Sequence, residues 1–285
     1  MKPLRIAVQK SGRLSEKSLK LLADCGIKIA TGSRKLSVTA RNFPLEVLFL
    51  RDDDIPQYVA SGISDLGILG LNEVEEKQQD VDVLRELGFA GCRMSLAVAK
   101  EVDYPGLKYF SGKAVATSYP NILESYFRDN KIDARVEEIG GSVEIAPGIG
   151  LAQGICDIVS TGSTLLMNGL KEVETVMTSQ AVLIGNKSMS RDASELLEKL
   201  LFRMEAVQQA KNKRYILLNA PNDKLDTITA LLPGMQSPTV MPLLKEGWSS
   251  LHSVIDEGDF WDVIDSLKGA GAQGILVTPI EKLIA

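Results

Sequence analysis

The sequence predicts an α/β protein in which two sheet-and-helix lobes precede a small C-terminal domain. Short apolar runs alternate with helical patterns over residues 1–100, which is typical of a largely parallel sheet covered by helices. The alternation returns over residues 101–179, so a second lobe is expected, with ligands bound where strands end between the lobes. After the charged stretch 211–214 the order becomes β-α-β-β-α-β, which is the ferredoxin-like order. We therefore expect lobe I over 1–100 with 180–213, lobe II over 101–179 and a C-terminal domain over 214–285.

The elements of the first lobe follow from apolar runs and from helix start and stop signals. Ser15 is placed to cap a helix that Gly26 ends, and Pro56 stands near the first turn of the next helix. Strands are expected at residues 4–9, 45–50, 65–70 and 93–99.

The rest of the chain is divided in the same way. Ser190 is placed to cap a long helix that runs to about residue 207. In the second lobe, strands are expected at 113–117, 135–139 and 156–160, with helices around 122–127 and 146–154. In the C-terminal domain, strands are expected at 215–218, 239–243, 251–255 and 273–278, with helices at 223–232 and 260–268.

Composition excludes several classes of protein. The chain has 32 basic and 37 acidic residues, whereas a nucleic-acid partner normally requires a basic face. Three scattered cysteines, an N-terminus without a signal-peptide pattern and the lack of a membrane-length apolar run indicate a cytoplasmic protein. The single histidine, His252, excludes a histidine-based zinc site.

The strongest functional signal is the segment 157–164, Asp-Ile-Val-Ser-Thr-Gly-Ser-Thr. A buried strand ends in hydroxyl residues around Gly162, and an apolar helix pattern follows. Glycine lets the backbone approach an anion, and the free N–H groups of a helix N-terminus can bind phosphate. Asp157 suits a ribose diol, because a carboxylate accepts both hydroxyl protons. An ordinary capped strand-to-helix turn explains the same spacing equally well.

Other strand ends carry weaker signals. Lys10 and Arg13 flank Gly12 just before a helix and could neutralise phosphates, although they could equally be surface charges. Arg51 ends a strand, and the three aspartates after it suit a helix N-terminus, with a role in binding Mg²⁺ or ribose as the alternative. The stretch from Asp65 to Gly70 has small residues where a ligand could approach, or where a strand packs tightly. Residues 117–120 form another possible strand-to-helix anion site, with an aromatic ring available for stacking.

Together these segments resemble the ATP phosphoribosyltransferase family of histidine biosynthesis, in its long form, over essentially the whole chain. The segment from Glu144 to Leu165 resembles the family signature, and residues 231–240 resemble the regulatory domain that the short form lacks. The other segments that carry the resemblance are 8–14, 51–56, 65–70, 91–93 and 116–120.

The resemblance implies a bilobal core similar to periplasmic binding proteins and a C-terminal ferredoxin-like (ACT/PII-like) regulatory domain. It also implies that the enzyme joins ATP to phosphoribosyl pyrophosphate (PRPP), with Mg²⁺ bound mainly through pyrophosphate. Histidine would inhibit by binding the C-terminal domain, and the chain would form homo-oligomers, dimers and hexamers, without nucleic acid or membrane as a partner.

Roles for individual residues follow from the resemblance. The cationic residues would serve the charges of the nucleotide and pyrophosphate: Lys10, Arg13 and Arg51. The residues expected to bind PRPP are Glu144, Asp157, Ser160, Thr161, Gly162, Ser163 and Thr164. Those expected to bind ATP are Gly12, Asp65, Gly70, Thr117, Ser118 and Tyr119. Those expected to bind histidine are Asn219, Met235, Ser237, Thr239, Ser253 and Val254. Asn219 stands where some members of the family have an acidic residue, and a neutral amide binds an ammonium group more weakly.

Three other classes of protein fit this sequence less well. A solute-binding receptor with a bilobal fold would carry a signal peptide and lack the C-terminal module. Prephenate dehydratase would carry a Thr-Arg-Phe motif, which this sequence does not contain. A ligand-sensing regulator would need a DNA-binding helix-turn-helix, whereas this chain begins with a strand pattern.

Overall fold

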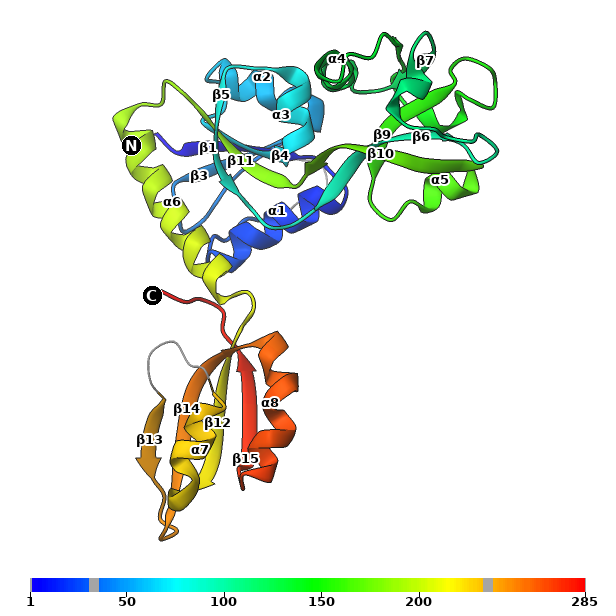
Figure 1. Cartoon of the computed structure of the whole chain (residues 1–285). Coiled ribbons are helices and arrows are strands. Elements are labelled where there is room, and N and C mark those ends of the chain that lie inside the picture. The colour runs from blue at the N-terminus through cyan, green and yellow to red at the C-terminus, as the bar shows by residue number, and fades with distance from the viewer. Residues whose placement is uncertain (1, 31–35, 233–237, 285) are drawn as a thin grey trace. The chain divides into compact units, whose positions relative to one another are not determined.

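The computed structural model describes residues 2–30, 36–232 and 238–284 (Figure 1). The chain forms two compact units, Met1–Leu197 and Glu198–Ala285. The first unit contains two sheets, and the second contains one. The second unit begins within a helix at residue 198, earlier than the boundary at 214 that the sequence suggests.

The first lobe is built on a six-stranded sheet with the order β2-β3-β1-β4-β11-β5. Strands β3, β1 and β4 are parallel neighbours, whereas β2, β11 and β5 pair antiparallel. The strands are β1 Leu4–Gln9, β2 Ser37–Thr39, β3 Leu45–Leu50, β4 Leu66–Gly70, β5 Val81–Glu86 and β11 Ala181–Asn186.

Helices cover both faces of this sheet, with α1 on one side and α2 and α3 on the other (Figure 1). The helices are α1 Arg13–Asp24, η1 Asp52–Asp54, α2 Ile55–Ala60 and α3 Leu71–Lys77. Helix α1 begins at Arg13 with Gly12 as its N-cap, so Ser15 does not cap it as the sequence predicts. Ser15 instead lies buried within the helix.

The second lobe is built on a five-stranded sheet with the order β10-β6-β9-β7-β8. Strands β9, β7 and β8 are parallel neighbours, and β6 and β10 pair antiparallel. The strands are β6 Cys92–Ala99, β7 Ala114–Thr117, β8 Arg135–Glu138, β9 Gly154–Val159 and β10 Leu170–Ser179. The helices are η2 Leu107–Phe110, α4 Pro120–Asp129, η3 Val143–Ile145 and α5 Ser163–Met167. The helix expected over residues 146–154 is absent, because only η3 forms and Gly154 already belongs to β9.

The chain crosses between the two sheets twice. It leaves the first sheet after β5 and enters the second at β6, and it returns at Gln180 between β10 and β11. Strand β6 therefore belongs to the second lobe, although the sequence places residues up to 100 in the first. The reason is that β6 pairs with both β9 and β10 and buries Met94, Leu96 and Val98 in the second core.

The expected bilobal α/β core is confirmed, with one sheet in each lobe. The sheets are mixed rather than purely parallel, because the crossover strands run antiparallel to their neighbours.

The C-terminal unit carries a four-stranded antiparallel sheet with the order β13-β14-β12-β15. This strand order and the chain order β-α-β-β-α-β are those of a ferredoxin-like domain. Helices α7 and α8 lie along one face of the sheet (Figure 1). The elements are α6 Arg191–Ala210, β12 Lys213–Pro221, η4 Asn222–Lys224, α7 Leu225–Ala230, β13 Thr239–Pro242, β14 Trp248–Asp256, α8 Glu257–Gly269 and β15 Gln273–Pro279. Ser190 caps α6 as expected, since its hydroxyl accepts the Ala193 N–H at 3.3 Å.

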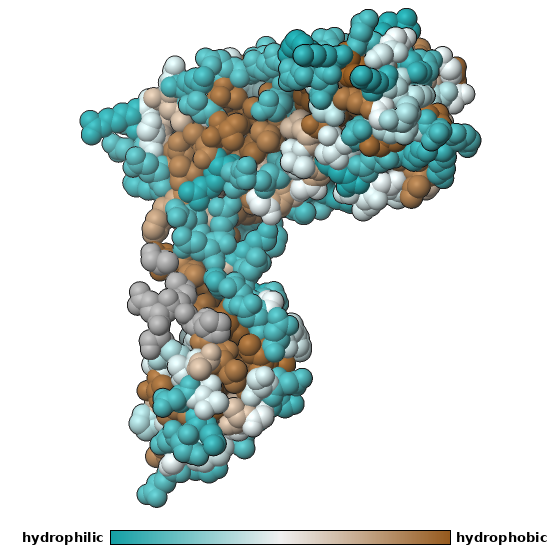
Figure 2. Space-filling model, viewed as in Figure 1, coloured by the Kyte–Doolittle hydropathy of each residue, from teal (hydrophilic) through white to brown (hydrophobic). Residues whose placement is uncertain are grey.

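The surface is mainly polar in the view of Figure 2, with apolar areas on both units. Exposed large apolar side chains include Ile149, Met167 and Leu276. Among the described residues, no helix is both long and apolar enough to cross a membrane.

Candidate active site

Predicted functional residues of the first lobe lie at the carboxyl edge of its parallel strands. Gln9 and Leu50 are paired at the ends of β1 and β3, and the Lys10 N–H donates to the Leu50 carbonyl at 2.8 Å. Lys10 and Arg51 are therefore the first residues beyond two adjacent strands. Gly70 ends β4 on the other side of β1. The structure thus brings together three of the predicted positions, as parallel strands require.

The loop after β1 presents exposed cations. Lys10 and Arg13 are exposed, and Gly12 between them adopts φ 92°, which a side chain would disfavour. The Gly12 carbonyl accepts the Glu16 N–H at 3.1 Å, which fixes the start of α1. Two cations are thus displayed beside the sheet edge on a backbone that requires glycine.

Arg51 is partly engaged by its own loop. Its Nε lies 3.3 Å from Asp53 Oδ1, while its side chain stays 79% exposed. The neighbouring Asp52 is anchored by Gln9, whose Nε2 donates to Asp52 Oδ2 at 3.1 Å. An exposed ion pair of this kind is weak, so Arg51 can exchange Asp53 for an anionic ligand.

Gly70 is required by packing. A Cβ at this position would lie 2.3 Å from Asn72 Oδ1, so any side chain would collide with the Asn72 amide. The small size of Gly70 is explained within the chain and is not evidence for a ligand.

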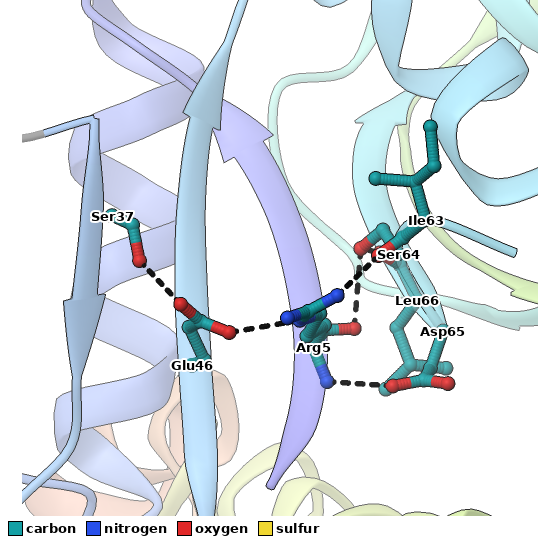
Figure 3. Close-up of polar contacts among 7 residues, drawn as sticks. All are labelled: Arg5, Ser37, Glu46, Ile63, Ser64, Asp65 and Leu66. Atoms are coloured by element: carbon teal, nitrogen blue, oxygen red, sulfur yellow. Dashed lines mark hydrogen bonds and ion pairs between the residues drawn. The ribbon is translucent and has the colours of Figure 1, made fainter.

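Asp65 does not lie with the predicted ATP-binding residues. It precedes β4, whereas the site edge lies at the other end of that strand. Asp65 Oδ2 accepts the Arg5 N–H at 2.8 Å, and the Asp65 N–H donates to the Arg5 carbonyl at 3.0 Å. Figure 3 shows this carboxylate beside the start of β1, where Arg5 also reaches Glu46. The geometry gives Asp65 a structural role in pairing β1 with β4, in place of the predicted contact with ATP.

The second lobe presents its own strand ends. Strands β7 and β9 are parallel, with Thr117 beside Cys156, so Asp157 projects at the same level as the turn after β7. Asp157 is half-buried, and its Oδ1 accepts the Ile158 N–H at 2.7 Å. Burial raises the pKa of Asp157, and the nearby Glu144 carboxylate adds to this rise. The Asp157 and Glu144 carboxylates therefore lie near enough for their charges to interact.

The segment after Asp157 forms an exposed loop that leads into α5. Gly162 adopts φ 80° and ψ 0°, the left-handed conformation, and is the N-cap of α5. The hydroxyls of Thr161 and Ser163 lie 3.0 Å apart, and Ser160, Thr161, Ser163 and Thr164 are all exposed. Arg93 of β6 supports the loop, because its Nη1 donates to the Ser160 carbonyl at 3.4 Å. Hydroxyl groups and helix N–H groups are therefore available together, as a phosphate site requires.

The turn before α4 is less open than the sequence suggests. The Thr117 hydroxyl oxygen accepts the Tyr119 N–H at 3.0 Å, and the Ser118 hydroxyl donates to the Ile139 carbonyl at 2.7 Å. Glu76 accepts the N–H groups of Asn121 and Ile122. Residues 117–120 are therefore not a free anion site, because these donors are already used within the chain.

Tyr119 and Glu73 join the two lobes. The Tyr119 phenol lies near the Glu73 carboxylate, and the charges of Glu73, Asp157 and Asp52 all act on it. Burial, followed by the Glu73 charge, raises the pKa of Tyr119 strongly. Burial and the Asp52 charge raise the pKa of Glu73 to about 7. Tyr119 of the second lobe thus lies near acidic residues of both lobes, Glu73 and Asp52 of the first and Asp157 of the second.

Sequence reasoning missed Glu73 and Glu76. Both belong to α3, whose acidic side chains have the pattern of a solvated helix face. Nothing local in the sequence marks them, because their burial comes from packing against residues of the second lobe.

The predicted effector residues of the C-terminal unit do not share one face. Asn219 of β12 lies opposite Ser250, and Val254 lies opposite Tyr215, on the face away from the helices. Ser253 lies opposite the buried Ile216 and faces the helix-covered core, since neighbouring strand residues point to opposite faces. Thr239 lies opposite His252 and is exposed. The predicted Met235 and Ser237 lie outside the described residues.

Comparisons with known proteins agree with this arrangement. Residues 51–206 match the family described as ATP phosphoribosyltransferase, and residues 210–282 match the family described as HisG, C-terminal domain. The chain is 59% identical to the ATP phosphoribosyltransferase of Bacteroides fragilis over 281 residues, which cover 99% of each chain. It is 55% identical to that of Cytophaga hutchinsonii, covering 99% of this chain and 98% of the relative.

Two solved structures show the likeness in three dimensions. The ATP phosphoribosyl transferase (HisG:HisZ) complex from Thermotoga maritima matches with a TM-score of 0.60 and 28% identity, over 71% of this chain and 98% of the matched one. At the level of fold alone, Tv2483 bound to L-arginine matches with a TM-score of 0.51 and 10% identity, over 73% of this chain and 86% of the matched one. The full-length relatives and the two family matches establish that the chain belongs to the ATP phosphoribosyltransferase family, with the C-terminal domain of its long form.

Proposed function

We propose that this chain condenses ATP with PRPP to give N1-(5-phosphoribosyl)-ATP and pyrophosphate, and that histidine inhibits it through the C-terminal domain. Family membership makes it a pentosyltransferase of the first step of histidine biosynthesis. The observation that supports the assignment of substrates to this site is the half-buried Asp157 carboxylate just before the exposed, hydroxyl-lined loop around Gly162.

In this proposal the PRPP phosphate binds the loop 160–164, and the ribose hydroxyls donate to Asp157 and Glu144. Adenine N1 attacks the anomeric carbon through an oxocarbenium-like transition state, and the bond to pyrophosphate breaks. Such a reaction depends on positioning and on neutralising charge more than on a strong base. Lys10, Arg13 and Arg51 are exposed at the opposite strand ends, where they can neutralise polyphosphate charge.

The residues present are compatible with a magnesium ion that enters the site bound to the phosphates of a substrate. No group of three or more potential ligands forms a metal site among the residues that the structure covers. Mg²⁺ commonly binds through one or two carboxylates together with substrate phosphates, and Asp157 with Glu144 can supply such carboxylates. When bound to pyrophosphate, the ion neutralises charge on the leaving group. We also propose a cytoplasmic homo-oligomer.

A direct assay tests this function. The protein is mixed with ATP, PRPP and Mg²⁺, and the ultraviolet change of an N1-alkylated adenine is followed with and without histidine. Product formation that histidine suppresses is expected. If neither ATP nor PRPP is consumed, the proposed reaction is excluded, and if histidine has no effect, only the regulatory part is excluded.

A further inference from the structure

Helix α3 carries three acidic residues with different surroundings. Glu73 and Glu76 are only 8% and 4% exposed, whereas Glu75 between them is exposed. Burying a carboxylate is unfavourable unless hydrogen bonds replace its lost water. Glu73 has a hydrogen-bond partner at the first turn of α3, whereas the backbone N–H groups that donate to Glu76 belong to the second lobe.

Glu76 caps a helix of the other lobe. Its Oε1 accepts the Asn121 N–H at 3.1 Å, and its Oε2 accepts the Ile122 N–H at 3.1 Å. The Asn121 side-chain amide donates back to the Glu76 carbonyl at 2.9 Å. These two N–H groups are the second and third of α4, the ones that an N-cap side chain normally satisfies. The N-cap residue Tyr119 makes no side-chain cap, so Glu76 takes that role from α3.

Glu73 holds the side chain of that same N-cap residue. Its Oε1 accepts from Asn72 Nδ2 at 3.1 Å, and its carboxylate lies close enough to the Tyr119 hydroxyl for the two groups to shift each other's pKa. Asn72 is in turn fixed by Ser179, whose hydroxyl donates to Asn72 Oδ1 at 2.9 Å and accepts the Asn72 N–H at 3.1 Å. Ser179 ends β10 beside the second crossover. A continuous chain of contacts therefore runs from the crossover to the Tyr119 ring.

We infer that Glu73 and Glu76 are positioning residues that fix Tyr119 between the two lobes, Glu73 through the Tyr119 side chain and Glu76 through the first turn of the helix that follows Tyr119. This inference rests on the proposed transfer between ATP and PRPP. Helix α3 starts directly after Gly70, at the carboxyl edge of the first sheet. Tyr119 follows β7, at the carboxyl edge of the second, and the Asp157 charge acts on its phenol. The two glutamates of α3 thus link the carboxyl edge of the first sheet to Tyr119, which lies at the carboxyl edge of the second.

The first experiment measures the Glu76 contact without reference to activity. Amide hydrogen exchange of Asn121 and Ile122 is followed by NMR in the full-length protein, in Glu76→Gln and in the matched control Glu75→Gln. Glutamine keeps the shape but offers one acceptor and one unwanted donor, so exchange is expected to quicken roughly tenfold at these two amides. Unchanged exchange in Glu76→Gln would show that Glu76 does not hold α4.

The second experiment measures positioning through a cycle of variants. We compare kcat and the KM for PRPP in wild type, Glu73→Gln, Tyr119→Phe and the double variant. Glu73→Gln is expected to lower kcat roughly tenfold with little change in the KM for PRPP, because the loop 160–164 is untouched. In the Tyr119→Phe background the same substitution is expected to have no further effect. Additive losses in the double variant would overturn the inference, because Glu73 would then act independently of Tyr119.

The outcomes separate the two levels of the proposal. A wild-type protein that does not convert ATP and PRPP overturns the proposed function itself. A wild-type protein that does so, with Glu73→Gln and Glu76→Gln variants that match it, overturns only the positioning role. Tyr119→Phe removes a single hydroxyl, so the activity arm stays informative even if Glu76→Gln fails to fold.

Discussion

Two aspartates on strands of the two lobes show how position decides the role of a residue. The Asp65 carboxylate, just before β4, accepts the Arg5 N–H, whereas Asp157 lies within β9, level with the turn after β7 and near Glu144. Both stand next to a buried apolar run in the sequence. Only the direction of the strand relative to the ligand-binding edge separates a structural carboxylate from a candidate ribose ligand.

Replacing Asp65 by alanine is expected to lower stability while leaving catalysis intact. The Arg5 N–H would lose its acceptor, which costs about 1 kcal/mol in the free energy of unfolding. Denaturant unfolding and steady-state kinetics with ATP measure the two effects. A raised KM for ATP at unchanged stability would restore Asp65 to the nucleotide site.

Replacing Thr161 or Thr164 by alanine is expected to weaken the use of PRPP. Each substitution removes an exposed hydroxyl from the loop 160–164, so kcat/KM for PRPP should fall by about 1–3 kcal/mol in transition-state stabilisation. Thr227→Ala on α7 is the control, since that threonine is exposed in the C-terminal unit. If both loop variants keep wild-type kinetics, the phosphate binds elsewhere.

At the scale of elements, the β9–α5 connection depends on one backbone conformation. Gly162 has φ 80°, and a Cβ there would meet nothing closer than Val159 Cγ1 at 3.9 Å. A substitution would therefore cost backbone strain rather than collision. The turn is built so that its hydroxyls and the α5 N-terminus face outward together.

Gly162→Ala is expected to lower stability by about 1 kcal/mol and to raise the KM for PRPP. Gly26→Ala is a matched control, because Gly26 has φ 76° with open space around it and lies at the end of α1. The control should lose similar stability with an unchanged KM. Thermal unfolding together with PRPP titration distinguishes the two variants, and equal KM values would argue against phosphate binding at this turn.

Helix α3 makes stability depend on pH. Burial and the charges of Asp52 and Asp53 raise the pKa of Glu73 from 4.5 to about 7, opposed by its hydrogen bond to Tyr119 and by Lys77. The folded state therefore holds a proton that the unfolded chain releases. The associated stability is fully present below pH 4.5 and is lost as pH rises to about 7.

Glu73→Gln removes this dependence. The free energy of unfolding of the variant, relative to wild type, is expected to rise on the order of 3 kcal/mol between these two pH values. Urea unfolding at several pH values measures the difference, in which the titration of other carboxylates cancels. Glu75→Gln should show no such trend. If the difference in unfolding free energy between Glu73→Gln and wild type does not change with pH, the Glu73 carboxylate is solvated rather than buried.

At the scale of the whole molecule, the C-terminal unit has the order of a ferredoxin-like domain, with one face of its sheet free of its own helices. Asn219 lies in the middle of β12 on that face, next to Ser250 and Gly274. Because Ser253 faces the opposite side, Asn219, Thr239 and Val254 are the described effector candidates that lie on that face.

Asn219→Asp is expected to strengthen inhibition by histidine. A carboxylate binds the ammonium group of the amino acid more strongly than an amide does, by about 1 kcal/mol or roughly fivefold in the inhibition constant. Asn212→Asp adds the same charge at an exposed position before β12 and should leave inhibition unchanged. Inhibition that is equal in both variants and wild type would place the effector away from Asn219.

The sequence by itself determined the α/β class, the ferredoxin-like order of the last domain and the loop around Gly162. These features depend on local periodicity and on residue types that only certain backbone conformations accept. The apolar run 181–184 carries a signal for β11, a strand that is missing from the elements predicted above. The charged strand β10 gave no such signal, because Lys171, Glu172 and Glu174 are tolerated at a sheet edge.

Only the tertiary structure decided what depends on contacts between distant segments. It moved β6 into the second lobe, removed Asp65 from the site and showed that Glu76 already occupies the first amides of α4. It also revealed the link from Glu73 to Tyr119. The physical reason is common to all four. Burial, strand direction and hydrogen-bond partners are properties of pairs of residues far apart in the chain, and local sequence does not encode which pairs will meet.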